Sequence, residues 1–353
     1  MVEWKKLGEI CEVLDSQRKP VSKGNRRGGV YPYYGANGIQ DYVENYIFDG
    51  TFLLLGEDGS VINKDKSPIL HWASGKIWVN NHAHILKEID NYSLRFIYYA
   101  LQCVDVSDIV RGVPPKINQA NMRNIQIPIP SLSEQNRIVG ILDTFTDSIE
   151  NLKQQIAQRR KQYEFYRDCI LKHFDSKETT WKKLSEIAEI FKGPYITKKN
   201  SNEGAVPVVM GGQKAAYYID NYNSEGESIV ISRSGINAGY VSFWNQPIFV
   251  SDGYRIDNKD LMVKKYLFYF LKSIEDKINL SKKGAGVPHV QSKFLLNILI
   301  PVPPLSEQSR IVSILDTFEA SISNLEAQLA QRQKQYEYYR NRLLSFGNGD
   351  GES

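Results

Sequence analysis

The chain has 353 residues, a formal net charge of +4 at pH 7, and 42% hydrophobic and 24% charged residues. This length allows two or more domains with their own cores, and the composition is ordinary for a globular protein. No apolar run reaches the length of a membrane span and the N-terminus lacks the apolar stretch of a signal peptide, so we expect a cytoplasmic protein with no membrane partner. The small net charge is weak evidence for a nucleic-acid partner.

Short β-type runs alternate with turns in the first 131 residues. Residues 50–56 and 77–79 have strand character, 95–101 form a short apolar helix, and a Gly/Pro-rich segment follows at 111–118. The three cysteines, Cys11, Cys103 and Cys169, are far apart and include no CxxC pair. We therefore expect reduced thiols and no bound metal.

A long amphipathic helix is predicted next, over residues 132–174. Its apolar residues recur at alternating steps of four and three, which is typical of a coiled-coil seam. Ser133 is the expected N-cap, and Arg159 is a polar residue within the seam. The predicted seam residues are Ile138, Leu142, Phe145, Ile149, Leu152 and Ile156.

The same order then repeats. WKKLGEI at 4–10 recurs as WKKLSEI at 181–187, a second strand-rich globule occupies 175–304, and a second helix is predicted over 305–346. Ser306 is its expected N-cap and Arg332 its polar seam residue. The seam residues are Ile311, Leu315, Phe318, Ile322, Leu325 and Leu329. A short acidic tail at 347–353 is expected to be disordered.

The duplication predicts an α+β protein with a pseudo-twofold internal repeat, in which two long antiparallel helices join two globules. Pairing of the two seams within one chain is the simplest arrangement. Packing of each helix on its own globule, or pairing between chains, are the alternatives. The two seam arginines either fix the helix register or extend to solvent.

The entry to each long helix carries a distinctive motif: PIPSLSEQNRIVGILD at 128–143 recurs as PVPPLSEQSRIVSILD at 301–316. This duplicated motif, with the two WKKL starts, resembles the specificity subunit of type I restriction–modification systems over almost the whole chain. The second copy has Pro304 where the first has Ser131.

The resemblance implies that the globules are target-recognition domains, each for one half of a bipartite, asymmetric double-stranded DNA site. It also implies that the helices set the spacing and dock two methyltransferase subunits, with restriction–translocase subunits joining the assembly. No cofactor is then expected on this chain, whereas S-adenosylmethionine and ATP with Mg²⁺ belong to the partners, which are expected to methylate adenine.

Candidate DNA contacts are loop residues with hydrogen-bond donors. Lys and Arg suit phosphates or guanine edges, Asn and Gln suit adenine edges, and Tyr can stack. Solvated loops, or core packing for the tyrosines, are the alternatives. The candidates are Lys23, Asn25, Arg26, Arg27, Tyr34, Asn37, Asn81, Arg111 and Lys116 in the first globule, and Lys198, Gln213, Lys214, Arg233, Ser234, Asn237, Lys282 and Lys283 in the second.

Other chemistry has little support. Glu57 and Asp58 could accept hydrogen bonds from cytosine, but solvent exposure is the simpler expectation. His82 and His84 lie two apart without a recognised metal motif. No phosphate-binding loop or catalytic motif is found, so no catalytic residue is assigned. A single-chain methyltransferase or nuclease, and a coiled-coil scaffold without a DNA role, are the alternative functions.

Overall fold

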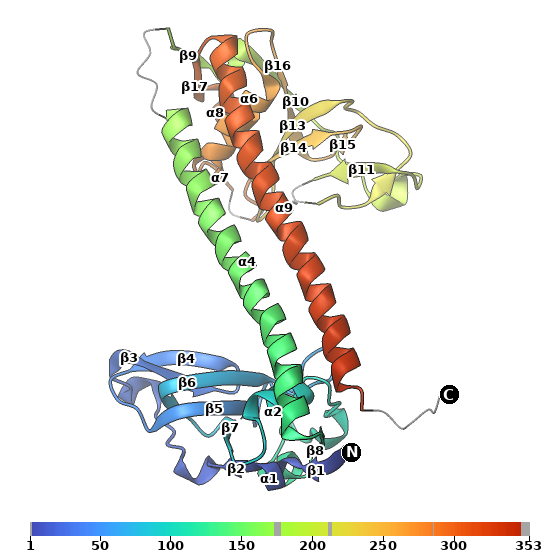
Figure 1. Cartoon of the computed structure of the whole chain (residues 1–353). Helices are drawn as coiled ribbons and strands as arrows, with labels where there is room; N and C mark the ends of the chain where they lie inside the picture. The colour runs from blue at the N-terminus through green and yellow to red at the C-terminus, as the bar shows by residue number, and fades with distance from the viewer. Residues whose placement is uncertain (1, 173–177, 211–213, 285, 347–353) are drawn as a thin grey trace. The chain divides into compact units, whose positions relative to one another are not determined.

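The structure is a computed structural model that describes residues 2–172, 178–210, 214–284 and 286–346. Figure 1 shows the order of the elements along the chain. The chain forms two compact units: the first comprises Met1–Lys153 and Gln328–Ser353, and the second comprises Gln154–Ala327. The tail at 347–353, expected to be disordered, lies outside the described residues.

The first unit is built on a six-stranded sheet with the strand order β2-β7-β5-β6-β3-β4. A separate antiparallel ribbon pairs β1 with β8. The strands are β1 (Glu3–Lys6), β2 (Cys11–Val13), β3 (Gly28–Gly35), β4 (Gly38–Val43), β5 (Phe48–Gly56), β6 (Leu70–Val79), β7 (Ala83–Glu88) and β8 (Gln126–Ile129). The short helices are α1 (Leu7–Ile10), α2 (Leu94–Leu101) and α3 (Gln119–Arg123).

The central strand β5 shows why the first unit folds around this sheet. Leu53 and Leu55 pack into a core that contains α2, whereas Phe52 and Leu54 pack with residues of β6 and β7. Side chains alternate across a strand, so a continuous apolar run is buried on both faces. α2 begins after Ser93, whose hydroxyl oxygen accepts a hydrogen bond from the backbone N–H of Phe96 at 3.3 Å.

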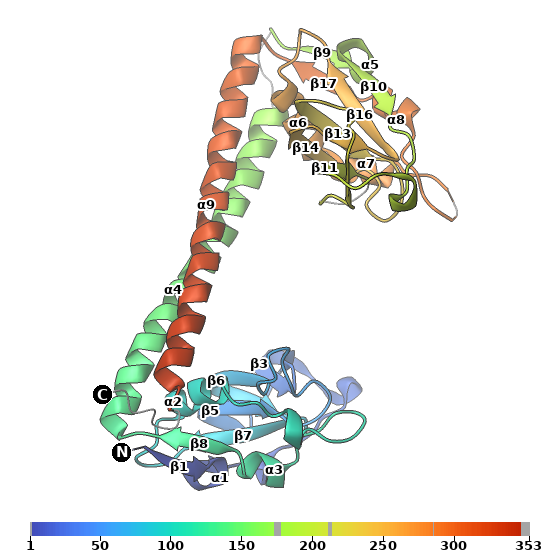
Figure 2. The same ribbon diagram turned by 90° about the vertical axis from the view of Figure 1, so that its right-hand side faces the viewer.

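The second unit has a four-stranded sheet with the order β10-β16-β13-β14 and a smaller sheet with the order β12-β11-β15. β9 pairs antiparallel with β17. The strands are β9 (Thr180–Lys183), β10 (Ala188–Lys192), β11 (Val206–Val209), β12 (Tyr218–Ile219), β13 (Glu227–Ser232), β14 (Val241–Asn245), β15 (Phe249–Val250), β16 (Gly253–Asn258) and β17 (Leu299–Val302). The short helices are α5 (Leu184–Ile187), α6 (Lys264–Ser273), α7 (Glu275–Leu280) and α8 (Ser292–Leu296), and α6 packs on β13, β14 and β16 (Figure 2).

The two units share one frame. Strands β2, β7, β5 and β6 of the first sheet correspond in order and direction to β10, β16, β13 and β14 of the second. The frames differ in what is added: β3 and β4 extend the first sheet, whereas β11, β12 and β15 form a sheet of their own. The α+β repeat predicted from the sequence is present in both units.

The two long helices are α4 (Leu132–Lys172) and α9 (Leu305–Leu344). Every predicted seam residue is buried or half-buried. In the second unit Arg160 pairs with Glu326 at 2.5 Å and Tyr163 hydrogen-bonds Glu319 at 3.3 Å, so the helix segments there run antiparallel. The seam arginines are half-buried, with Arg159 over the Phe318 ring and Arg332 over the Phe145 ring, at 5.9 and 5.7 Å from the ring centroids.

A buried glutamine fastens each globule to its long helix. Gln135 accepts a hydrogen bond from the backbone N–H of Ser93 and donates one to the carbonyl of Pro130, both at 2.9 Å. Gln308 does the same with Val263 and Pro303, at 2.8 and 2.9 Å. Both glutamines belong to the duplicated Ser-Glu-Gln motif. Their hydrogen bonds explain why the glutamine of this motif is buried.

The expected N-caps were wrong. α4 begins at Leu132 and α9 at Leu305, so Ser133 and Ser306 lie inside the first turn. The hydroxyl of Ser131 accepts from the Glu134 N–H at 3.4 Å, and the Pro304 carbonyl accepts from the Glu307 N–H at 2.9 Å. In each helix, a residue just before the first turn therefore accepts a hydrogen bond from one of the backbone N–H groups that have no partner within the helix.

Candidate nucleic-acid interface

The loop before β3 carries four of the predicted contacts. Lys23 and Asn25 belong to an exposed 3-10 turn, Lys23–Asn25. Arg27 is exposed, and its ion pair with Glu44 spans 3.5 Å. Arg26 is held differently: its guanidinium lies 4.1 Å from the centroid of the Tyr33 ring, and Nε donates to the Val21 carbonyl at 3.0 Å. Arg26 therefore supports the loop and keeps fewer donors for DNA than Arg27.

Tyr34 and Asn37 lie at the end of β3. Asn37 is exposed in the turn between β3 and β4. Tyr34 is half-buried and packs against the core cluster that contains Leu54 and Ile85. Burial raises the pKa of the Tyr34 hydroxyl above its usual value. Of these two residues, Asn37 is the more accessible to a ligand.

Arg111 and Lys116 close a hairpin. They exchange two backbone hydrogen bonds of 2.9 and 2.8 Å, and both residues are exposed. The Lys116 ammonium lies 2.9 Å from the Glu57 carboxylate. Asn81 is also exposed. Its backbone carbonyl accepts a hydrogen bond from Nη1 of Arg18 at 3.4 Å. The hairpin and the turn before β7 thus meet near the end of β5.

The expected exposure of Glu57 was wrong. The residue is 9% exposed, and Nη1 of Arg18 lies 2.5 Å from its carboxylate. Burial by itself would raise the pKa of Glu57, but hydrogen bonds from Arg18 and Lys116 hold it below its usual value. Both partners are distant in sequence, so no local pattern indicates this burial.

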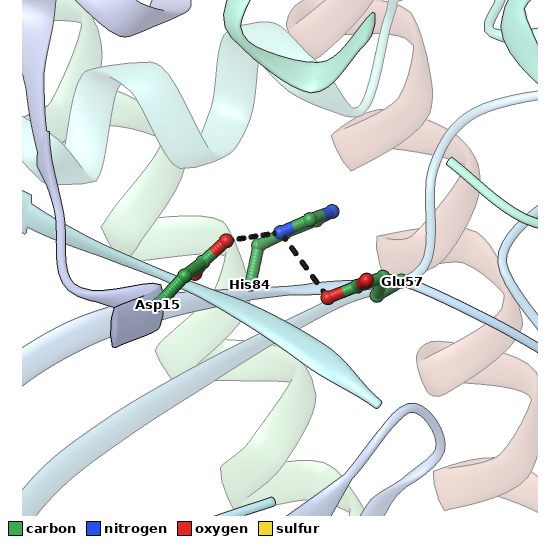
Figure 3. Close-up of side chains that lie close together, drawn as sticks. All are labelled: Asp15, Glu57 and His84. Carbon is green, nitrogen blue, oxygen red and sulfur yellow. Dashed lines mark hydrogen bonds and ion pairs between the residues drawn. The ribbon is translucent and has the colours of Figure 1, made fainter. Parts of the chain in front are cut away.

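Asp15, Glu57 and His84 form a buried ionic cluster (Figure 3). His84 is fully buried; its Nδ1 is 2.6 Å from Asp15 and 3.6 Å from Glu57, and its Nε2 is 2.8 Å from the Ile117 carbonyl oxygen. Burial would raise the pKa of Asp15, but its hydrogen bond with His84 and further contacts lower it.

The ligand atoms of this cluster lie within 4.8 Å of one another, a spacing that could hold a metal ion. Arg18 already supplies a positive charge there, 2.5 Å from Glu57 and 3.6 Å from Asp15. Both ring nitrogens of His84 also face oxygen atoms. We therefore interpret the cluster as ionic hydrogen bonds that hold Asp15, in the segment after β2, against Glu57 at the end of β5 and His84 of β7.

Several predicted contacts of the second unit are simply exposed on loops. Lys198 lies in a 3-10 turn, and Lys214 and Asn237 are exposed. Lys282 is half-buried, and its ammonium hydrogen-bonds the Asn279 side chain at 3.2 Å. Lys283 exchanges two backbone hydrogen bonds of 2.9 Å with His289. Gln213 lies outside the described residues.

Arg233 and Ser234 follow β13 and converge on Asp252, a residue that the sequence did not single out. Nη1 of Arg233 lies 2.5 Å from Oδ1 of Asp252, and the Ser234 hydroxyl donates to Oδ2. Burial would raise the pKa of Asp252, but the hydrogen bonds from Ser234 and Arg233 lower it. The equivalent loops of the first unit bring His82 and Asp58 together, with 2.5 Å between Nδ1 and Oδ1.

The repeated frame, the paired helices and the donor-rich loops define a duplicated recognition protein. A family model described as the type I restriction modification DNA specificity domain matches residues 1–159 and 177–333. The chain belongs to this family, which confirms the resemblance seen in the duplicated motif. It is accordingly a specificity chain and not a catalytic one.

Relatives in three organisms support this placement. The chain is 35% identical to a Haemophilus influenzae protein named as a type I restriction enzyme specificity subunit, over 98% of this chain and 96% of the relative. It is 28% identical to the specificity subunit of the type I restriction enzyme EcoR124I/EcoR124II from Escherichia coli, over 98% and 94%. It is 34% identical to the specificity subunit of the MjaVIII enzyme from Methanocaldococcus jannaschii, over 96% and 91%.

Solved structures share the fold. The S subunit of a type I restriction–modification system from M. genitalium aligns with a TM-score of 0.73 at 16% identity, over 99% of this chain and 97% of that one. A chain from a study of complex assembly and conformational transition of the type I system aligns with a TM-score of 0.56 at 17% identity, over 97% and 96%. Among the described residues, no helix combines the length and apolar character needed to cross a membrane.

Proposed function

We propose that this chain is the DNA-recognition subunit of a type I restriction–modification assembly. Each unit recognises one half of a bipartite, asymmetric site in double-stranded DNA. The chain itself carries no catalytic residue and brings its partner subunits to the site. The predicted contact residues are part of this proposal, with the exposed loops before β3, after β5 and after β13 as the contact surface.

The observation that carries the proposal is one frame with two different sets of loops. The order of the four shared strands and the attachment of the long helix are the same in both units, whereas the residues that follow β5 and β13 differ. A shared scaffold with divergent loops is expected of domains that bind different ligands. The domain limits are part of the proposal: recognition domains at 1–131 and 175–304, and helical segments at 132–174 and 305–346.

We propose partners of the kind that the family resemblance implies. Two methyltransferase subunits dock on the helical segments, and restriction–translocase subunits join them. S-adenosylmethionine, ATP and Mg²⁺ bind to these partners, and the methyltransferases turn an adenine out of each half-site to methylate it. The assembly acts in the cytoplasm of a bacterium or archaeon. The helices set the number of base pairs between the half-sites.

Methylation mapping tests the proposal. Genomic DNA is compared between cells that express this chain with its cognate methyltransferase and cells that express the methyltransferase alone. A bipartite motif that appears only with the chain is the expected result. Replacement of residues 1–131 by those of a relative should then change one half of the motif and leave the other unchanged.

The alternative functions predict other outcomes. A scaffold would associate with the methyltransferase and leave the methylation pattern unchanged, which would overturn the proposal. A single-chain enzyme would methylate or cut DNA without any partner. Binding of the assembled complex to DNA should also weaken steeply with salt, because phosphate contacts release counterions.

A further inference from the structure

The residues after β5 and after β13 occupy equivalent places in the two units. Gly56 pairs with Ala83 across β5 and β7, and Ser232 pairs with Gly253 across β13 and β16. The hairpin that follows docks in the same way: the Ile117 N–H donates to the Glu57 carbonyl at 2.9 Å, and Val290 does the same to Arg233 at 2.9 Å.

These hydrogen bonds define two equivalent corners. The first corner consists of Glu57, Asp58, His82 and Lys116, and the second consists of Arg233, Ser234, Asp252 and His289. Asp58 and Lys116 form an isolated antiparallel bridge, as do Ser234 and His289. The backbone of the corner is therefore conserved between the units of this molecule while its side chains are free to differ.

The two corners carry different charges. Glu57 stands where the second unit has Arg233, and His82 stands where it has Asp252. Each corner nevertheless places a carboxylate against a nitrogen donor: Asp58 lies 2.5 Å from His82, and Asp252 lies 2.5 Å from Arg233. A difference of charge on an identical frame changes which chemical groups the corner accepts.

In the second corner, Asp252 orients the Arg233 guanidinium, which is still partly accessible. Arg233 and Asp252 have side chains that are 25% and 20% exposed. A guanidinium has five N–H donors; Asp252 takes one and the Tyr254 side chain also interacts with the group, so the donors on the exposed part of Arg233 can bind an acceptor outside the protein. Nδ1 of His289 is buried without a hydrogen-bond partner among the described residues, so the corner also has an unmade hydrogen bond.

We propose that the second corner recognises one G·C base pair in the half-site of the second unit. Arg233 donates to O6 and N7 of guanine, and Asp252 both holds the guanidinium in place and accepts from the cytosine amino group. Arginine on guanine and a carboxylate on cytosine are the pairings that the major groove allows for this base pair. This inference rests on the proposed function and assigns Asp252 a role in specificity.

The test is methylation mapping with substituted chains in complex with the methyltransferase. Arg233→Gln should move the preference at one position of the second half from guanine towards adenine, since an amide suits the adenine edge. Arg233→Lys keeps the charge but loses the two-pronged geometry and should lower the preference for guanine by about 5- to 150-fold. Asp252→Asn should weaken the same preference because the guanidinium loses its anchor.

Arg255 provides the matched control. It pairs with Asp257 at 2.8 Å in the same unit, and its side chain is 24% exposed, close to that of Arg233. Arg255→Gln should leave the motif unchanged. His82→Ala, in the other corner, should affect only the first half. Thermal melting of each complex shows whether a substitution acts through folding.

Two results would overturn the inference. One is a wild-type second half without a G·C pair. The other is a uniform loss of methylation in Arg233→Gln and Arg233→Lys with every base preference retained. If the wild-type chain produces no motif of its own, the proposed function fails instead. The two failures are therefore distinguishable.

Discussion

Phe145 of α4 stacks on Tyr339 of α9, with ring centroids 5.3 Å apart and ring planes at 25°. The equivalent residues of the repeat make the same contact in the second unit: Phe318 of α9 stacks on Tyr166 of α4, at 5.5 Å and 29°. The internal repeat thus extends to individual ring contacts. Each unit contains one such pair, so each fixes the helix register in its own half.

A double-mutant cycle can measure the first stack. Phe145→Leu and Tyr339→Leu, singly and together, should show a coupling of about 0.5–1.5 kcal/mol in the free energy of unfolding of the full chain. The control is the same cycle with Phe165→Leu in place of Phe145→Leu, because Phe165 of α4 is 64% exposed; it should show no coupling with Tyr339→Leu. A coupling of zero would mean that the two rings contribute only through burial.

The buried glutamines should be more important for stability than their polar character suggests. Gln135→Ala leaves the Ser93 N–H and the Pro130 carbonyl without their partner. Each unsatisfied buried group costs about 1–3 kcal/mol, so for the two groups we expect a loss of roughly 2–6 kcal/mol in the free energy of unfolding, measured by chemical denaturation. Asn136→Ala, at the next, exposed position, should change stability by less than about 0.5 kcal/mol. Equal effects of the two substitutions would contradict this assignment.

The buried ionic cluster should make the first unit sensitive to acid. Although burial opposes it, hydrogen bonds lower the pKa values of Asp15 and Glu57 in the folded state. The unfolded chain therefore binds more protons than the folded chain at acidic pH. Stability from these groups is complete above their ordinary pKa values of about 4 and is lost as the pH falls below them.

Melting temperatures between about pH 7 and pH 3 measure this effect. Asp15→Asn should lower the melting temperature at pH 7 and flatten its fall at acidic pH. Asp90→Asn, at an exposed position, should follow the wild-type curve. A wild-type slope in Asp15→Asn would show that other carboxylates cause the acid sensitivity.

The sequence predicted the elements that depend on local periodicity. Both long helices follow from the spacing of residues such as Leu142 and Leu315, because a repeat of 3.5 residues identifies a helical seam directly. The burial of Glu57 and the alignment of Arg233 with Asp252 could not be predicted. They depend on side chains that lie far away in sequence, and only the pairing of β13 with β16 brings Asp252 to its partner.

The helix ends illustrate the same limit on a smaller scale. Ser133 looked like the N-cap because it precedes a Glu and an apolar run, yet Ser131 already serves that purpose. Sequence alone could not decide between two serines in one turn. Loop residues such as Arg27 and Asn37 could be predicted as candidates because donor-rich turns are visible in the sequence, and both are exposed; their contact with DNA and the bases they would bind stay predictions.

Helix length should set the spacing of the bipartite site. Insertion of seven residues after Gln154 in α4 and seven after Ala327 in α9 preserves both seams, because seven residues form one full repeat. The insertion lengthens each helix by about 10 Å, which equals about three base pairs of DNA. We therefore expect methylation mapping to show a spacer that is longer by about three base pairs, with both half-sites unchanged.

A matched control uses insertion in one helix only. Seven extra residues in α4 alone keep its apolar face but shift its pairing with α9 by one heptad on one side of the insertion. The complex should therefore lose activity rather than acquire a new spacer. If the doubly extended chain keeps the original spacer, the helices do not set the spacing, and the loops at the ends of the units would have to do so. If it changes the bases of a half-site, the insertion has disturbed a recognition domain, which the melting temperature of the complex would reveal.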